Sequence, residues 1–400
     1  MEIIYSFGID DFATELKQHL NLSESAWQVV YDDIHNFYPN EEQESFSGFL
    51  NRVFKNFYQA AEATISLRFL EKVEELEKLY SSNEFKSLDK KTIAMFIDKY
   101  THVYESELKE KALSYENGHG EKFRINKDNL DILRESLEGN YYEGTIGLYL
   151  KAIFEEYAQK PAYIREQIFF LDTVNQINLA ISKQRKLKLI LNQKVSVKGD
   201  IKYTQRYYVS PYKIVQDKTS QFNYLVGYSE KINDIEVTDA NGKIKKSSEV
   251  GEKTVCCFRI SRINQIGLMS SMGAKISEEH KKELNEELVK RTPMYMSSNP
   301  IDIKVRFTDK GLELLKRQIY MRPQFYDVDK TDKHIYIFHC TEIQLTNYLW
   351  KFGWDAYVME PNNLSMKFKI RYERALKSYN GMTKEEIFES EASEYNNDSN

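Results

Sequence analysis

Cysteine is scarce in this chain of 400 residues, and long apolar runs are absent. The three cysteines, Cys256, Cys257 and Cys340, are too few and too irregularly spaced for a disulfide framework or a zinc site. Neighbouring strand residues point to opposite faces, so we expect Cys256 and Cys257 on opposite sides of a sheet, as small buried side chains. No run approaches the roughly 18 apolar residues of a membrane span, and acidic residues stand where a signal peptide would be basic and apolar. We therefore predict a cytoplasmic protein without a membrane partner.

The sequence also lacks the motifs of common catalytic sites. It contains no HExxH, GxSxG, P-loop or GxGxxG pattern, and its seven histidines are scattered. His334 and His339 fall on a predicted hairpin, where their spacing favours a structural role over metal binding. Carboxylates are not paired at a metal-binding spacing. We expect no enzyme activity, no cofactor and no bound metal.

Charge is distributed unevenly along the chain. The net charge of the whole chain is -5, and residues 381–400 alone, with one lysine and six acidic residues, account for that excess. Residues 181–230 instead hold ten basic and three acidic side chains, a local charge of +7. Such a segment in a mildly acidic protein indicates a surface for a polyanion, although a solvated face would have the same composition.

Aromatic residues are interleaved with these cations. They are Tyr203, Tyr207, Tyr208, Tyr212, Phe222, Tyr224 and Tyr228, in two apolar runs joined by the turn-like QDKTSQ, which predicts a hairpin. Single-stranded nucleic acid requires such a mixture, because unstacked bases stack on aromatic rings while phosphates contact cations. The alternative is that the tyrosines fill the core of a small barrel. We expect most of them to do so, and one to three to contact a ligand.

Four segments of this region resemble the WYL domain, a small SH3- or Sm-like β-barrel of bacterial regulators named for a Trp-Tyr-Leu triplet. The segments are INLAISKQRKLKLIL, YYVSPYKIV, FNYLVGYSE and CCFRISRINQI. Here the triplet reads Asn223, Tyr224 and Leu225, and Ser210 before Pro211 matches the family's polar residue. The family's FR..RI pattern matches Phe258, Arg259, Arg262 and Ile263. Asn223 replaces the usual tryptophan, and Cys256 stands where a further arginine is common.

The resemblance and the basic segment together define a candidate binding site for nucleic acid or another ligand. Its predicted residues are Lys183, Arg185, Lys188, Arg206, Tyr208, Ser210, Tyr212, Tyr224, Arg259 and Arg262.

The segment after the predicted barrel reads as a charged helical linker over 272–300, followed by elements in the order β-α-β-β-α-β. That order is the ferredoxin-like split unit, which needs no cofactor. The stretch LWKFGWDAYVMEP is similar to the C-terminal extension of many WYL regulators. Aromatic residues there, with the exposed edges of such a unit, predict a homodimer held through residues 301–379.

An internal repeat marks the N-terminal part. A displacement of one hundred residues aligns FSGFLNRVFKNFYQ (46–59) with IGLYLKAIFEEYAQ (146–159), and the apolar positions form one helical stripe in both copies. A short helix precedes each copy, and a short strand, WQVV or KFRI, precedes that helix. This is the ribbon-helix-helix pattern, in which paired strands enter the DNA major groove.

We expect the two repeats to pair within one chain, with 27–31 and 122–126 as antiparallel strands. The exposed face of the second strand would carry Lys122, Arg124 and Asn126, and that of the first only Gln28 and Val30. The possible DNA-binding residues of this ribbon are therefore Gln28, Lys122 and Arg124. Such an uneven ribbon reads a symmetric operator poorly, although helix N-termini also bind phosphates.

The sequence thus predicts an α+β multidomain protein. We expect a helical domain with two ribbon-helix-helix repeats over 1–172, a WYL barrel over 173–271, the linker over 272–300, a dimerisation module over 301–380 and an acidic disordered tail over 381–400. Two functional classes are similar to this arrangement. One is the WYL accessory proteins of type VI-D CRISPR systems, which would bind single-stranded RNA and enhance an RNA-guided ribonuclease. The other is the WYL transcription regulators, which bind DNA and sense a ligand. The basic, tyrosine-rich barrel favours the first.

Overall fold

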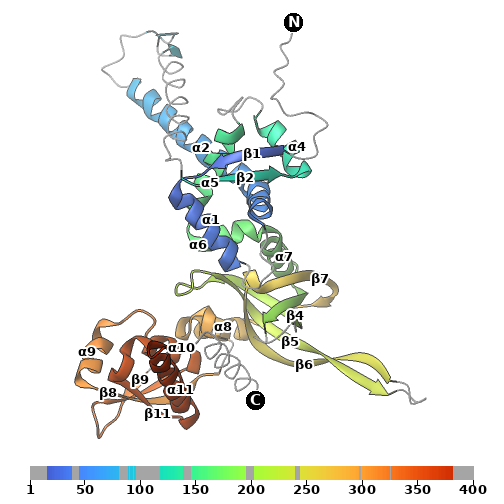
Figure 1. Cartoon of the computed structure of the whole chain (residues 1–400). Coiled ribbons are helices and arrows are strands. Elements are labelled where there is room, and N and C mark those ends of the chain that lie inside the picture. Colours follow the sequence, from blue (N-terminus) through green and yellow to red (C-terminus); the bar gives the residue numbers. More distant parts are fainter. Residues whose placement is uncertain are drawn as a thin grey trace. The chain divides into compact units, whose positions relative to one another are not determined.

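The structure is a computed structural model that describes residues 16–37, 45–80, 89, 91–92, 94–95, 118–137, 146–194, 202–238, 244–296, 299–324 and 326–381. It is a mixed α+β protein with two compact units, Met1–Leu171 and Asp172–Asn400 (Figure 1). Of the predicted acidic tail, only Gly381 belongs to the described residues. The segment KKTIAMFIDKYTHVYESELKEKA (90–112), which the sequence predicts to be helical, also lies mostly outside them.

The first unit contains a two-stranded sheet and several helices among its described residues. In chain order they are β1 (Leu16–Asn21), α1 (Glu24–Phe37), α2 (Phe46–Tyr80), β2 (Gly120–Ile125), α4 (Lys127–Leu137), α5 (Ile146–Ala158) and α6 (Ala162–Phe169). Strands β1 and β2 pair antiparallel within the chain, from Leu16 opposite Ile125 to Asn21 opposite Gly120 (Figure 1). The order strand, helix, helix therefore occurs twice.

The predicted partner of the second strand was wrong. Residues 27–31 lie inside α1, and Leu16–Asn21 forms the strand instead. The helix is favoured because Ala26, Val30, Ile34 and Phe37 form one buried stripe at helical spacing. A short apolar run such as WQVV fits either a helix or a strand when it is read alone.

The repeat explains how the core of this unit is built. Its equivalent positions, Phe49 and Tyr149, Leu50 and Leu150, Val53 and Ile153, Phe54 and Phe154, and Phe57 and Tyr157, are all buried. The second helix of each repeat also fixes the N-terminal end of the first helix of the other repeat. Glu155 of α5 accepts hydrogen bonds from the backbone and hydroxyl of Ser23 before α1, and Asn51 of α2 accepts one from the backbone N–H of Asn126 before α4.

A five-stranded antiparallel sheet forms the first part of the second unit, after α7 (Leu171–Ser182). Its strands are β3 (Arg185–Lys194), β4 (Lys202–Gln216), β5 (Asn223–Thr238), β6 (Ile244–Arg259) and β7 (Ile263–Gly273), in the spatial order β6-β5-β4-β3-β7. The predicted turn QDKTSQ joins β4 to β5, where the Asp217 carboxylate accepts hydrogen bonds from the backbone of Thr219 and Ser220. One face of the sheet buries Leu187, Leu189, Val209 and Leu225.

Helix α8 (Glu278–Lys290) and the 3₁₀ turn η3 (Pro293–Tyr295) follow the sheet and lead to a four-stranded sheet. Its elements are β8 (Ile301–Phe307), α9 (Asp309–Arg317), β9 (Tyr326–Val328), β10 (Ile335–Cys340), α10 (Glu342–Leu349), η4 (Trp350–Asp355), β11 (Ala356–Glu360) and α11 (Asn362–Tyr379). The spatial order of the strands is β11-β8-β10-β9. Threonine hydroxyls at 308 and 341 cap α9 and α10, and the helices bury Leu315, Leu345 and Phe368 against one face of the sheet.

Candidate nucleic-acid interface

The candidate site lies on the face of the five-stranded sheet opposite its Leu187–Leu189 core; we call it the outer face. Directly paired residues of antiparallel strands share a face. The strand register therefore places one row across all five strands: Lys253 on β6, Glu230 on β5, Tyr208 on β4, Lys188 on β3 and Gly267 on β7. The next row contains Arg206 opposite Ile190 and Ile232. Two predicted cations and one predicted tyrosine are thus neighbours.

We call the part of the outer face formed by the rows of Tyr208 and Arg206 the open half. This part is positively charged. Glu230 is the one carboxylate in these rows. It accepts a hydrogen bond of 2.5 Å from the ammonium of Lys186, whose positive charge balances its negative charge. Lys188 and Lys253 are exposed, and Arg206 and Tyr208 are half-exposed. The ammonium of Lys253 also lies 4.8 Å from the ring centre of Tyr228. A phosphate that approached Tyr208 would find Lys188 on the β3 side and Arg206 in the next row of the same strand, whereas the β5 side carries Glu230, which is paired with Lys186.

Gly267 leaves space at the edge of the open half. A Cβ atom added to Gly267 would meet no atom within 4 Å. Gly267 is paired with Lys188, so the side of Lys188 that faces β7 has no side chain beside it. The Lys188 side chain is therefore accessible from that direction.

The remaining part of the outer face, the covered half, is occupied by the chain itself. Tyr224, Val226, Tyr228 and Cys257 form a buried cluster with Ile276, Leu284 and Met296, which come from α8 and its flanking segments. Tyr224 is only 8% exposed, and burial raises the pKa of its hydroxyl. The sequence predicts Tyr224 as a binding residue, but in this conformation its ring packs against the protein and is not open to a base.

Polar contacts hold α8 on the covered half. The Tyr228 hydroxyl donates to Glu283 at 3.0 Å, and Asn285 donates to the Tyr212 hydroxyl at 2.9 Å and accepts from Lys213 at 2.7 Å. Burial and the Glu283 carboxylate raise the pKa of Tyr228 to about 12. Tyr228 is therefore a neutral hydrogen-bonding group beneath the helix.

The other predicted site residues are dispersed around this face. Ser210 is buried beside Tyr228, and the guanidinium of Arg259 lies 3.2 Å from the ring centre of Phe222. Arg262 is exposed in the short 3₁₀ turn after β6, and Lys183 is exposed in the turn after α7. Arg185 begins β3 and is opposite Gly273. Only Lys188, Arg206 and Tyr208 are brought together on the open half.

The two-stranded ribbon of the first unit presents a second positively charged surface. The register pairs Lys17 with Arg124 and His19 with Lys122, and all four side chains are exposed. Gln28 is not on this ribbon: it lies in α1 and donates a hydrogen bond to Asp32 at 2.9 Å. The prediction of an uneven ribbon is therefore wrong, because basic residues occupy both strands.

Sequence reasoning missed Lys17, His19 and Lys253. The segment LKQHLN alternates between exposed Lys17 and His19 and the more buried leucines, which is the pattern of a half-buried strand. Lys253 lies outside the basic segment and joins Tyr208 only through the strand register. Lys17 and His19 could have been found from this alternation, whereas Lys253 could be assigned only from the pairing of the strands.

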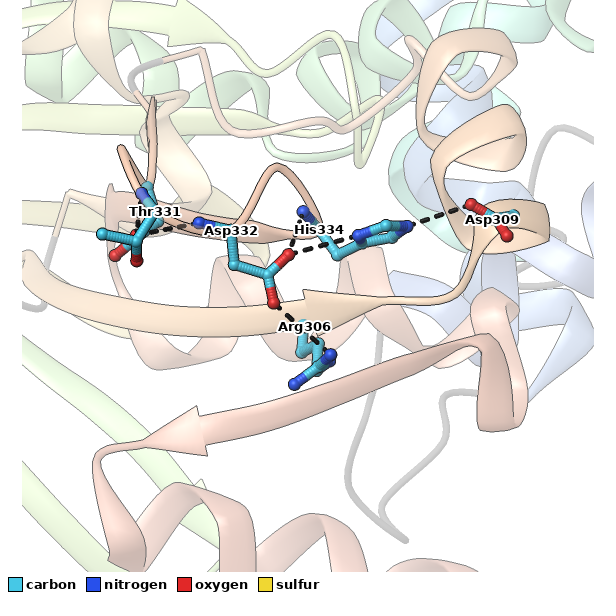
Figure 2. A network of polar contacts seen from close by, with 6 residues as sticks. Arg306, Asp309, Thr331, Asp332 and His334 are labelled. Atoms are coloured by element: carbon cyan, nitrogen blue, oxygen red, sulfur yellow. Dashed lines mark hydrogen bonds and ion pairs between the residues drawn. The ribbon is translucent and has the colours of Figure 1, made fainter.

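The four-stranded sheet also exposes charged residues, but here they are paired with one another. His339 contacts Asp302 at 2.6 Å and Asp327 at 3.1 Å, and Lys304 lies 3.6 Å from Glu360. Figure 2 shows His334 between Asp309, at 3.0 Å, and Asp332, at 3.2 Å, with Arg306 on the other oxygen of Asp332. The aspartates raise the pKa of both histidines. Charges paired in this way make the surface a poor site for a polyanion.

Among the described residues, neither the cysteines nor the potential metal ligands are arranged as a nucleophilic or a metal site. All three cysteines are buried, Cys257 on the outer face and Cys256 opposite it, and burial raises the pKa of Cys256 and Cys340 to about 12. Within the described ranges, no three His, Cys, Asp or Glu side chains are grouped to hold a metal ion. No helix in that part of the chain is long and apolar enough to cross a membrane.

The fold is similar to that of a solved structure described as a crystal structure of a CRISPR Cas-related protein. The TM-score is 0.62 at 24% sequence identity, and the match covers 92% of this chain and 95% of the other. A second structure, proteasome accessory factor B/C of Arthrobacter aurescens, covers 66% of this chain and 39% of its own at 13% identity, with a TM-score of 0.28 that is too low to indicate a shared fold. No protein-family model matches the sequence, and no curated protein matches it.

Proposed function

We propose that this protein is a non-enzymatic accessory protein of a CRISPR system that binds single-stranded RNA on the open half of the outer face. The observation that carries the proposal is the half-exposed Tyr208, with Lys188 beside it on β3 and Arg206 in the next row. Gly267 leaves space beside Lys188, and Lys253 lies at the far end of the row, beyond the Glu230–Lys186 pair. A base can stack on the ring while its neighbouring phosphates contact the lysines.

We assign the parts of the chain to three modules. The antiparallel pairing of β1 with β2, each followed by two helices, supports a pair of ribbon-helix-helix repeats within one chain. The five-stranded antiparallel sheet with Ser210, Tyr224 and Arg259 supports a WYL barrel. The strand order β11-β8-β10-β9 supports a ferredoxin-like module.

The CRISPR role draws on the fold likeness to a protein described as CRISPR Cas-related, which extends over nearly the whole of both chains. As a working role, we propose that the RNA-bound protein enhances the cleavage rate of an RNA-guided ribonuclease of the type VI-D class. A purified ribonuclease of that class, loaded with guide and target RNA, is assayed with and without this protein. Faster cleavage with the wild type, and less gain with Lys188→Ala, supports the role; equal rates with and without the protein contradict it.

The RNA-binding part is tested separately, by fluorescence anisotropy with labelled oligo-uridine. Affinity should fall steeply with salt, because each neutralised phosphate releases counterions. The matched variants are Lys188→Ala on the open half and Lys290→Ala at the end of α8. Binding that is insensitive to salt, or lost equally in both variants, would rule out the open half as the RNA site.

We further propose a homodimer formed through the four-stranded sheet module. Phe352 lies in the core of that module and Trp350 stacks on Tyr372, whereas Trp354 is 81% exposed. A large exposed aromatic side chain suits an isologous contact. Light scattering of the full chain and of Trp354→Glu tests this: a dimer that becomes a monomer supports the contact, and an unchanged mass places any dimer interface elsewhere.

The ribbon favours a second candidate function, binding of duplex DNA as a transcription regulator. Lys17, His19, Lys122 and Arg124 form an even, exposed basic surface on two paired strands, the element that enters the major groove in ribbon-helix-helix proteins. Selection from a random duplex library would give a defined sequence motif if this function holds. Recovery of no motif would leave the ribbon at most a non-specific contact.

A further inference from the structure

The covered half of the outer face has the composition of a binding surface rather than of an ordinary core. Beneath α8 lie the polar tyrosines Tyr212 and Tyr228, and the ammonium of Lys253 lies beside the Tyr228 ring. Strand β4 continues from Tyr212 to Tyr208 in the open half, where Lys188 of β3 lies beside Tyr208. Aromatic rings and cations therefore continue across both halves.

Helix α8 contributes two apolar side chains to the cluster on this surface, the buried Leu284 and the partly buried Leu288. Its sequence, EEHKKELNEELVK, is mostly charged, and Leu284 is its one buried residue. The helix places the carboxylate of Glu283 on the Tyr228 hydroxyl, on the same face as Lys253. A carboxylate in that place occupies the position that an RNA phosphate would take next to a stacked base.

We propose that α8 is a displaceable cover, and that single-stranded RNA extends onto Tyr228 and Tyr212 when the helix leaves the sheet. This inference rests on the proposed RNA binding of the open half. RNA bound at Tyr208 is held next to the cover, so its neighbouring nucleotides compete with Glu283 at a high effective concentration. The protein then has a short site with α8 in place and a longer one with α8 displaced.

The main test uses the full chain with two variants of α8 and a matched control for each. Leu284→Asp removes the apolar anchor, and Val289→Asp places the same charge on the exposed side of the helix, where Val289 is 74% exposed. Glu283→Gln removes the competing charge, and Glu286→Gln removes an exposed carboxylate from the same helix. Affinity for labelled oligo-uridine is measured for each.

Leu284→Asp should bind oligo-uridine about tenfold more tightly than the wild type, the effect of one additional stacked base. Glu283→Gln should bind severalfold more tightly, and both controls should equal the wild type. Wild-type protein that binds no RNA contradicts the proposed function itself. Wild-type binding with no gain in a folded Leu284→Asp overturns the cover alone.

Hydrogen exchange of the wild type keeps the test decisive if Leu284→Asp does not fold. Backbone amides of α8 should exchange faster when oligo-uridine is bound, because the helix loses its contacts with the sheet. Unchanged or slower exchange in α8, together with no gain in Glu283→Gln, means that the helix is a permanent part of the core.

Discussion

The ribbon of the first unit and the open half of the second unit's sheet are both antiparallel, exposed and basic, but they differ in aromatic content. The exposed face of the ribbon carries Lys17, His19, Lys122 and Arg124 and no tyrosine. The open half places Tyr208 among its cations. Cations alone contact phosphates of any nucleic acid, whereas a ring between cations also offers a stacking surface to an unpaired base. The two surfaces are therefore suited to different nucleic acids.

The largest difference between the two surfaces is expected from a variant that destabilises only the first unit, which carries the ribbon. Phe123 is fully buried on the inner side of the ribbon, so Phe123→Ala should lower the free energy of unfolding of the first unit by about 3–5 kcal/mol. Chemical denaturation followed by circular dichroism measures this, with Arg124→Ala as the exposed control. RNA binding measured in parallel should survive. Its loss in a variant whose second unit remains folded would show that the first unit supplies the RNA site.

The contribution of stacking is tested at Tyr208. Tyr208→Ala should weaken oligo-uridine binding by about 1–3 kcal/mol, because a base loses its stacking partner, whereas Tyr208→Phe retains the ring and should bind nearly as the wild type does. Tyr379→Ala, at a 91% exposed position, is the control. Anisotropy titrations give the affinities. Equal effects of Tyr208→Ala and Tyr208→Phe would show that the hydroxyl, not stacking, matters.

The two surfaces should also differ in their response to salt. Lys188→Ala should reduce the slope of log affinity against log salt by about 0.7 for single-stranded RNA, and Lys122→Ala should reduce it by about 0.9 for duplex DNA. Each variant serves as the control for the other ligand. A single variant that changes both slopes would contradict the assignment of separate ligands.

The smallest effect is expected at the four-stranded sheet, whose charges are paired. His334 and His339 have folded-state pKa values raised above 6.5 by their aspartate partners. Their contribution to stability is therefore fully present below pH 6.5 and decreases as pH rises through the raised values. Thermal melting at a series of pH values should show this decline, and it should be weaker in His339→Asn. An identical pH profile in the variant would show that His339 contributes nothing.

Periodic elements were predictable from the sequence, and ambiguous or long-range features were not. The stripes that include Phe49 and Tyr149 repeat at helical spacing, and the elements of residues 301–379 have clear boundary signals such as Thr308 and Thr341. The run WQVV satisfies both helical and strand patterns, so the first strand was misplaced and Gln28 with it. Lys188, Arg206 and Tyr208 follow from local composition and alternation.

The state of Tyr224 could not be read from its neighbours in the sequence. Its burial depends on Leu284 and Met296, which are far away in the chain and pack on it only because α8 and η3 fold back over the sheet. Composition identifies an aromatic, basic surface, but it does not show which half of that surface another segment covers.

The central claim is that single-stranded RNA contacts the open half of the outer face. The most direct measurement is photocrosslinking of the full chain to oligo-uridine that contains 4-thiouridine, followed by identification of the crosslinked peptides by mass spectrometry. Crosslinks should concentrate on Tyr208, Lys188 and Lys253, three positions on separate strands that meet only in the folded sheet. Crosslinks confined to the β1–β2 ribbon, with none on β3, β4 or β6, would contradict the account.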